Sequence, residues 1–159
     1  MLIKYKTRIS LVYAFIAAII YSATVFVFLW YQSYVLSWLL YMGNALFGIV
    51  IAIFIYRYSK TNNYTVKISQ LIAMGQKTTI IGILISCIMC LLLLLFLSPD
   101  VFLKPDANTA ALQNVPGQLQ NGNTNYLLML FMDAIIGNIS TGSFIAILFP
   151  FTIVRFKDQ

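Results

Sequence analysis

The chain has 159 residues, of which 61% are hydrophobic and only 9% are charged, and its mean hydropathy is +0.89. This composition excludes a soluble domain, which exposes far more charge, and predicts an all-α integral membrane protein, because a span in lipid must satisfy its own backbone hydrogen bonds. The net charge of +6 comes from residues at the ends of apolar stretches, which indicates membrane topology and not nucleic-acid binding. The chain has no histidine, so it lacks the most common zinc ligand and general base.

Four apolar stretches are each long enough to cross a bilayer as a helix. The predicted spans are 9–30, 37–56, 78–97 and 126–149. The first follows basic residues, but it is too long for a typical signal-peptide core and lacks a small-residue cleavage site, so it is interpreted as an uncleaved span. Residues 66–76 have apolar side chains at helical spacing, which suits either a short helix on the membrane surface or an extension of the third span. Pro150 is expected to end or kink the fourth span.

The predicted connections differ sharply in composition. Residues 98–125 form a long polar segment with too little apolar content to build a core, so we expect a mobile loop between the third and fourth spans. The first connection is short and uncharged, and the aromatic residues around it suit the headgroup level of a membrane. These residues are Trp30, Tyr31, Tyr34, Trp38 and Tyr41. Residues 1–159 are therefore expected to form one membrane domain without a separate soluble domain.

Lysine and arginine predict the orientation of the chain. Nine of the ten basic residues lie before the first span, between the second and third spans, or after the fourth span. Only Lys104 lies in the long loop. Because cytoplasmic connections carry an excess of Lys and Arg, both termini are expected in the cytoplasm and the long loop outside, in a multi-pass protein of the inner membrane.

Each predicted span carries small or polar residues four positions apart, which lie on one face of a helix. Small residues let helices approach closely in lipid, so we expect a compact four-helix bundle with these stripes inward and the large aliphatic and Phe side chains facing lipid. The stripes are Ala14, Ala18 and Ser22; Asn44, Gly48 and Ala52; Thr78, Gly82, Ser86 and Cys90; and Asp133, Gly137 and Thr141. The positions expected to make the closest helix contacts are Gly48, Gly82, Ser86, Gly137 and Thr141.

Asp133 is the only acidic residue inside a predicted span. A carboxylate at bilayer depth costs about 3 kcal/mol, so it requires a partner or a use. With a rise of roughly 1.5 Å per residue, Asp133 and Asn44 lie at a similar depth below the outer ends of their spans. The sequence therefore predicts an intramembrane polar site made of Asp133, Asn44, Ser22, Thr24 and Asn138. Two interpretations stay open: hydrogen bonds to Asn44 and Ser22 that lock helix packing, or a proton or cation site.

Cys87 and Cys90 form a C-x-x-C pair inside the third span. Four spans, cytoplasmic termini and a long outer loop are similar to the quinone-linked disulfide oxidases of bacterial membranes. Those proteins keep a C-x-x-C near the outer end of the second span and another cysteine pair in the long loop. This chain has its pair in the third span and no cysteine in the loop, so the relay cannot be built. A membrane thiol redox protein is the most distant alternative.

The chain more closely resembles small uncharacterised bacterial integral membrane proteins that are grouped as domains of unknown function. The resemblance rests on size, four spans, the Lys77-Thr78-Thr79 start of the third span and Asp133 in the fourth. It implies no activity, and the sequence offers no nucleophile–base pair, metal cluster or phosphate loop, so we expect neither an enzyme nor a cofactor.

The leading hypothesis is a structural or accessory subunit that packs in the bilayer against itself or a larger partner. The alternative is a small transporter or channel component that uses Asp133 and Asn44.

Overall fold

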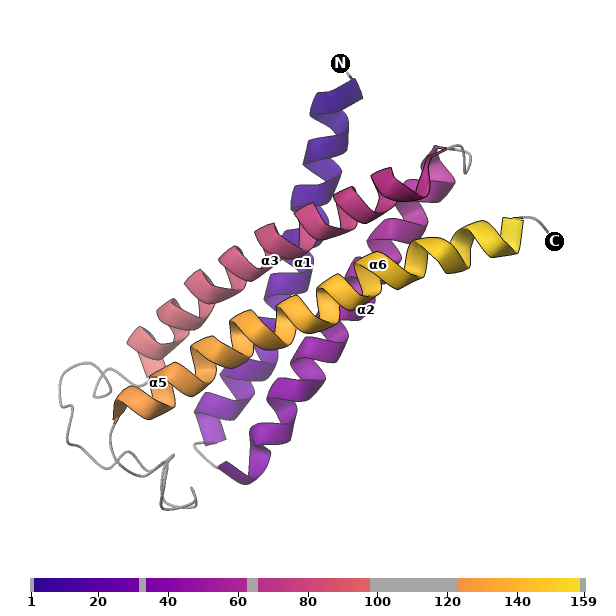
Figure 1. Cartoon of the computed structure of the whole chain (residues 1–159). Coiled ribbons are helices and arrows are strands. Elements are labelled where there is room, and N and C mark those ends of the chain that lie inside the picture. The colour runs from indigo at the N-terminus through magenta and orange to yellow at the C-terminus, as the bar shows by residue number, and fades with distance from the viewer. Residues whose placement is uncertain (1, 32–33, 63–65, 98–122, 158–159) are drawn as a thin grey trace.

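All regular structure in the described part of the chain is helical. The computed structural model describes residues 2–31, 34–62, 66–97 and 123–157. Three spans are single helices, and the fourth contains a π-helical turn between two α-helices (Figure 1). The elements are α1 (Leu2–Tyr31), the 3-10 helix η1 (Tyr34–Ser37), α2 (Trp38–Thr61), α3 (Ile68–Leu97), α5 (Asn123–Met132), the π-helix η3 (Asp133–Gly137) and α6 (Asn138–Lys157).

Four helical segments are long and apolar enough to cross a membrane. They are Arg8–Tyr31, Val35–Thr61, Ile68–Leu97 and Leu128–Ile153. Large apolar side chains cover their outer surface, including Phe96 at 83% exposure and Phe144 at 64%. Apolar coverage of this extent suits lipid and not water. The protein is therefore a multi-pass membrane protein with four spans.

The four spans pack as a square in cross-section. Helix α1 packs against α2 and α3, and α6 packs against the same two helices, so α1 and α6 lie at opposite corners. In Figure 1, α3 and the α5–η3–α6 helix run side by side in front of α1 and α2. A side chain that joins α1 to the fourth span must therefore cross the centre of the bundle.

Several helix ends differ from the sequence expectations. Residues 68–76 belong to α3, so they extend the third span and do not form a separate surface helix. Helix α6 continues past the buried Pro150, so the expectation that proline ends this helix is wrong. Helix α5 begins at Asn123, which makes 123–125 helical, while the rest of the expected long loop lies outside the described residues.

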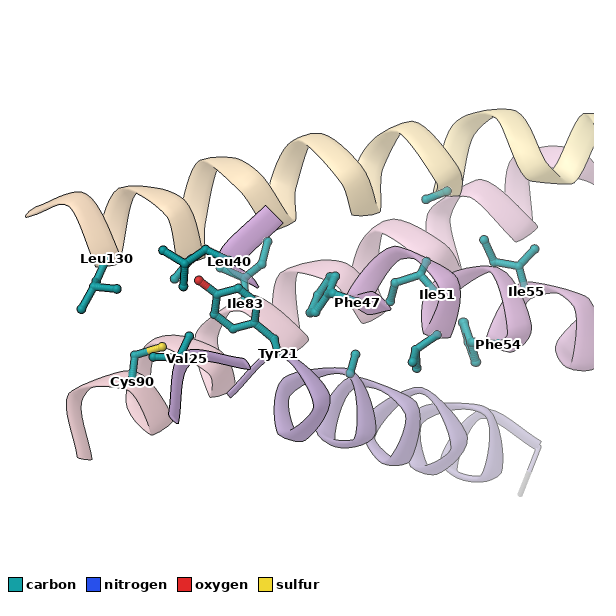
Figure 2. Packing of buried hydrophobic residues seen from close by; sticks show 14 of the residues in the cluster. Tyr21, Val25, Leu40, Phe47, Ile51, Phe54, Ile55, Ile83, Cys90 and Leu130 are labelled. Atoms are coloured by element: carbon teal, nitrogen blue, oxygen red, sulfur yellow. The ribbon is translucent and has the colours of Figure 1, made fainter. Parts of the chain in front are cut away.

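The centre of the bundle contains large side chains as well as small ones. The expectation that Phe side chains face lipid holds for Phe96 and Phe144 and is wrong for Phe28, Phe47 and Phe54, which are fully buried. Figure 2 shows Phe47 and Phe54 among the buried residues. For Phe47, the physical reason is that two glycines make space for the aromatic ring. A Cβ at Gly82 would lie 2.9 Å from the Phe47 ring, and one at Gly142 would lie 3.2 Å from it.

The small-residue stripes do meet across two seams, which we define as the α1–α3 seam and the α2–α6 seam. In the α1–α3 seam, the Ser10 and Thr78 hydroxyls are 2.7 Å apart. The Thr78 proton is donated to the Met74 carbonyl at 2.8 Å, so Ser10 is the donor to Thr78. In the α2–α6 seam, Gly48 packs directly against Thr141. Close approach of this kind gives the dispersion contacts that hold membrane helices together.

Candidate functional site

Asp133 lies at the first position of the π-helix η3 and joins three spans. Its Oδ2 accepts a hydrogen bond of 2.9 Å from the Tyr21 hydroxyl on α1, and its Oδ1 accepts one of 3.0 Å from Asn44 Nδ2 on α2. Figure 2 shows Tyr21 at the centre of the bundle with its hydroxyl directed toward the fourth span. In the described part of the chain, no Lys or Arg pairs with Asp133. We call Asp133, Tyr21 and Asn44 the three-helix polar centre.

Side chains of α6 satisfy backbone carbonyls in and beside the π-helical turn. Asn138 Nδ2 donates to the Ala134 carbonyl at 2.9 Å, and Thr141 Oγ1 donates to the Gly137 carbonyl at 2.9 Å. A π-turn disturbs the regular i to i−4 ladder, and a carbonyl at bilayer depth needs a donor from within the protein. Asn138 thus stabilises the turn that carries Asp133, and it is not one of the side chains that contact the carboxylate.

Gly137 allows α2 to approach η3 closely enough for Asn44 to reach Asp133. A Cβ at Gly137 would overlap the Asn44 carboxamide, with the Cγ only 2.7 Å away. Glycine is required here because of the close approach and not because of an unusual backbone angle. The position therefore controls the Asn44–Asp133 hydrogen bond.

The structure brings together some of the predicted site residues and not others. Asn44 contacts Asp133, whereas Ser22 makes no hydrogen bond to it, and Tyr21 supplies the second donor. Ser22 Oγ is buried without a hydrogen-bond partner among the described residues, where it borders α3. Thr24 Oγ1 donates to the Tyr21 carbonyl at 2.7 Å and packs against Gly43. Neither Ser22 nor Thr24 belongs to the three-helix polar centre.

Tyr21 is the functional residue that sequence reasoning missed. The sequence pattern assigned a place only to the tyrosines around the first connection and none to Tyr21, which is fully buried in the middle of a span. Its position next to the small-residue stripe of α1 was an available signal, because Ala17 and Ala18 leave space beside a large side chain. A buried tyrosine requires a hydrogen-bond partner for its hydroxyl, and an acid in another span is a natural acceptor.

A groove of about 550 Å³ opens between α2 and the α5–η3–α6 helix, and we call it the α2–η3 groove. One wall includes Ser37 of η1 with Tyr41 and Asn44 of α2, and the opposite wall includes Asp133 and Ser140. Apolar side chains lie between these polar groups: Leu40, Met129, Met132 and Ile136. The groove therefore gives a route from the lipid-facing surface to the Asp133 carboxyl group.

A second groove, of about 380 Å³, lies between α1 and α3 and differs in chemistry. Its walls are almost entirely apolar, with Phe26, Met89 and Phe96 among them. Ser22 is the one hydroxyl-bearing residue in its lining. An acyl chain suits this surface, whereas it cannot satisfy the polar groups of the α2–η3 groove.

The two cysteines lie on α3 and are both free thiols. Cys90 is buried at 1% exposure, and Cys87 is half-buried. They pack in the apolar interior as small hydrophobic residues do.

Comparison with family models, with curated proteins and with solved structures finds no match to this chain. Of the expected resemblance to small bacterial membrane proteins, only the presence of four apolar spans is supported. Function must be argued from the three-helix polar centre and the α2–η3 groove.

Proposed function

We propose that this protein is a structural or accessory membrane subunit that acts through helix packing with itself or with a larger membrane protein. The observation that carries the proposal is the bonding of Asp133, whose two carboxylate oxygens each accept a hydrogen bond from a different span. The one acid in the described spans is thereby used to join α1, α2 and η3.

The magnitudes indicate what such a centre contributes. Two hydrogen bonds between membrane helices contribute about 1 kcal/mol together. Placing a carboxylate at bilayer depth costs about 3 kcal/mol. The three-helix polar centre is therefore not a large source of net stability, and its proposed effect is to select one arrangement of the helices. Removing a single partner is still costly, because it leaves the others buried and unpaired.

The proposed setting is the inner membrane with both termini in the cytoplasm. Support comes from the distribution of Lys and Arg, which are concentrated at both chain ends and between the second and third spans. Aromatic side chains at the opposite end of the bundle are exposed, as expected at a headgroup layer: Trp30, Tyr31, Trp38 and Tyr41.

A small transporter or channel component is a second candidate. The observation that favours it is the α2–η3 groove, which reaches Asp133 and Asn44. The two candidates predict different results for Asp133→Asn. A packing role tolerates this change, because asparagine can still accept from Tyr21, whereas a proton- or cation-handling role loses flux while the fold is kept.

Gentle extraction from native membranes followed by mass spectrometry of the intact complex tests the leading proposal. A stoichiometric foreign membrane protein, or a defined homo-oligomer, is the expected result. A lone monomer contradicts the accessory role and leaves the second candidate, which proton and cation flux assays in liposomes then test with Asp133→Asn.

A further inference from the structure

We propose that the α2–η3 groove binds a small amphiphilic amine, with its ammonium group at Asp133 and Asn44 and its apolar body along the groove walls. This binding does not require the accessory role proposed above. It would name the substrate class of the transporter candidate, which uses the same acid.

The shape of the groove fits a small molecule. At about 550 Å³ it falls within the typical range of roughly 300–1,000 Å³ for ligand sites, which often lie between helices of a bundle. One wall is lined by Ser37 at the end of η1 and then by Leu40, Tyr41, Asn44 and Ala45, which share one face of the first two turns of α2. The opposite wall follows the same helical spacing along α5, η3 and α6.

Three polar residues that line the groove carry hydrogen-bond acceptors, and we call Asp133, Asn44 and Thr141 its polar floor. Asp133 accepts one bond at each oxygen, and a carboxylate oxygen has room for a second. Asn44 is only 5% exposed, and its Oδ1 is buried without a hydrogen-bond partner among the described residues, so Asp133 is the main acceptor for a ligand. The Thr141 hydroxyl already donates its proton to Gly137, so it is available only as an acceptor. A ligand that matches this floor must donate.

The charge of the floor requires a cation. Asp133 has no Lys or Arg partner in the described part of the chain, so a ligand that pairs with the ionised form of this carboxyl group must supply the positive charge. A lipid acyl chain in the groove would leave the carboxylate and the Asn44 oxygen unsatisfied in an apolar medium, which is costly. A primary ammonium group offers three donors and one charge, which matches the Asp133 carboxylate.

The walls of the groove select for an apolar body. Leu40 and Ile136 are aliphatic, and Met129 and Met132 supply flexible thioether side chains that adapt to ligands of different shape. A polar or strongly hydrated amine would leave this surface without contacts. The combination of adaptable apolar walls and an acidic floor is what points to an amphiphile.

Equilibrium binding of radiolabelled octylamine to the full chain tests the proposal, in phosphatidylcholine nanodiscs and with empty nanodiscs subtracted. We expect saturable binding of one octylamine per chain, with octanol bound roughly tenfold more weakly or worse, because it lacks the charge-assisted hydrogen bond. Asp133→Asn should reduce octylamine binding to the level of octanol. Octylamine bound no better than octanol by the wild-type chain overturns the proposal.

Two further variants keep the test decisive if Asp133→Asn folds poorly. Ala45→Phe fills the groove from an exposed position on α2 without touching the hydrogen bonds of Asp133, and it should abolish octylamine binding. Ser143→Ala removes a hydrogen bond of 3.0 Å to Gln76 on α3, and since neither residue lines the groove, binding should be unchanged. Octylamine binding by Ala45→Phe at wild-type strength contradicts a site in this groove.

A competition experiment distinguishes a lipid headgroup from a free amine as the natural ligand. Phosphatidylethanolamine included in the nanodiscs should compete with octylamine if a lipid headgroup is the natural occupant, and should not compete if the occupant is a free amine. Both results support an ammonium site. A lone monomer in native mass spectrometry would remove the accessory role and would leave the octylamine result unaffected.

Discussion

The α1–α3 seam and the α2–α6 seam are built from the same kinds of small residue but end differently. The α1–α3 seam contains the Ser10–Thr78 contact of 2.7 Å, and the groove beside it is apolar. In the α2–α6 seam, the helices are in close contact where Gly48 packs against Thr141. Beside this contact lies the α2–η3 groove, which Asp133 lines. Small residues alone therefore do not determine whether the groove beside a helix seam is apolar or contains polar groups.

The difference comes from the π-helical turn and from one acid. Within the described spans, only the fourth contains a π-turn, and this turn begins at Asp133. Insertions of this kind occur often at functional sites, because they redirect side chains and disturb backbone pairing. The α1–α3 seam has the features of pure packing, whereas the α2–α6 seam combines packing with polar chemistry.

The largest expected effect is at the closest contact of the polar seam. Gly137→Leu should destabilise the protein by about 3 kcal/mol or more, because the new side chain overlaps the Asn44 carboxamide and breaks its bond to Asp133. Thermal or denaturant unfolding in detergent measures this. Ser140→Leu, at an exposed position on the same helix, is the matched control and should unfold close to wild type.

Asp133→Leu should have the next largest effect, about 2 kcal/mol. It leaves the Tyr21 hydroxyl and the Asn44 amide buried without their acceptor. Asp133→Asn keeps an acceptor and should cost less than about 1 kcal/mol. If Asp133→Leu proves as stable as wild type in the same unfolding assay, the packing role of Asp133 is wrong.

Tyr21→Phe should destabilise by about 1 kcal/mol, since the ring still fills the centre and only the bond of 2.9 Å to Asp133 is lost. Tyr13→Phe is the control, because the Tyr13 ring contact with Phe54, with centroids 5.4 Å apart, is kept. Equal losses for the two variants would mean that the Tyr21 hydroxyl has no special part in the bundle.

The smallest effect is expected in the α1–α3 seam. Ser10→Ala removes the hydroxyl bond to Thr78 but keeps the close helix contact, so it should cost about 0.6 kcal/mol or less. Unfolding of this variant beside Tyr21→Phe compares the two seams directly. A loss larger than that of Tyr21→Phe would reverse the contrast between them.

The sequence allowed much of the architecture to be predicted, because apolar length and small-residue spacing are local properties. The pairing of Asn44 with Asp133 followed from their similar depth in the span. Tyr21 was missed because a single tyrosine gives no sign of whether it faces lipid or the bundle centre. The burial of Phe47 depends on glycines from two other helices, which spacing within one helix cannot reveal.

The π-turn and the α2–η3 groove could not be predicted for a different reason. Nothing in the residues Asp133 to Gly137 distinguishes a π-turn from an α-helix, and the bonds from Asn138 and Thr141 to carbonyls four residues earlier are ones that a regular helix also permits. The groove depends on how α2 and the fourth span diverge, and that is a property of the packed bundle.

The central claim is that Asp133 joins α1 to the fourth span through Tyr21, and a double-mutant cycle tests it most directly. The free energy of unfolding is measured for Tyr21→Phe in the wild-type chain and in Asp133→Leu. The hydrogen bond predicts a loss of about 1 kcal/mol in the wild-type background and little or none when Asp133 is absent. The same loss in both backgrounds would show that the two residues are not coupled and would contradict the account.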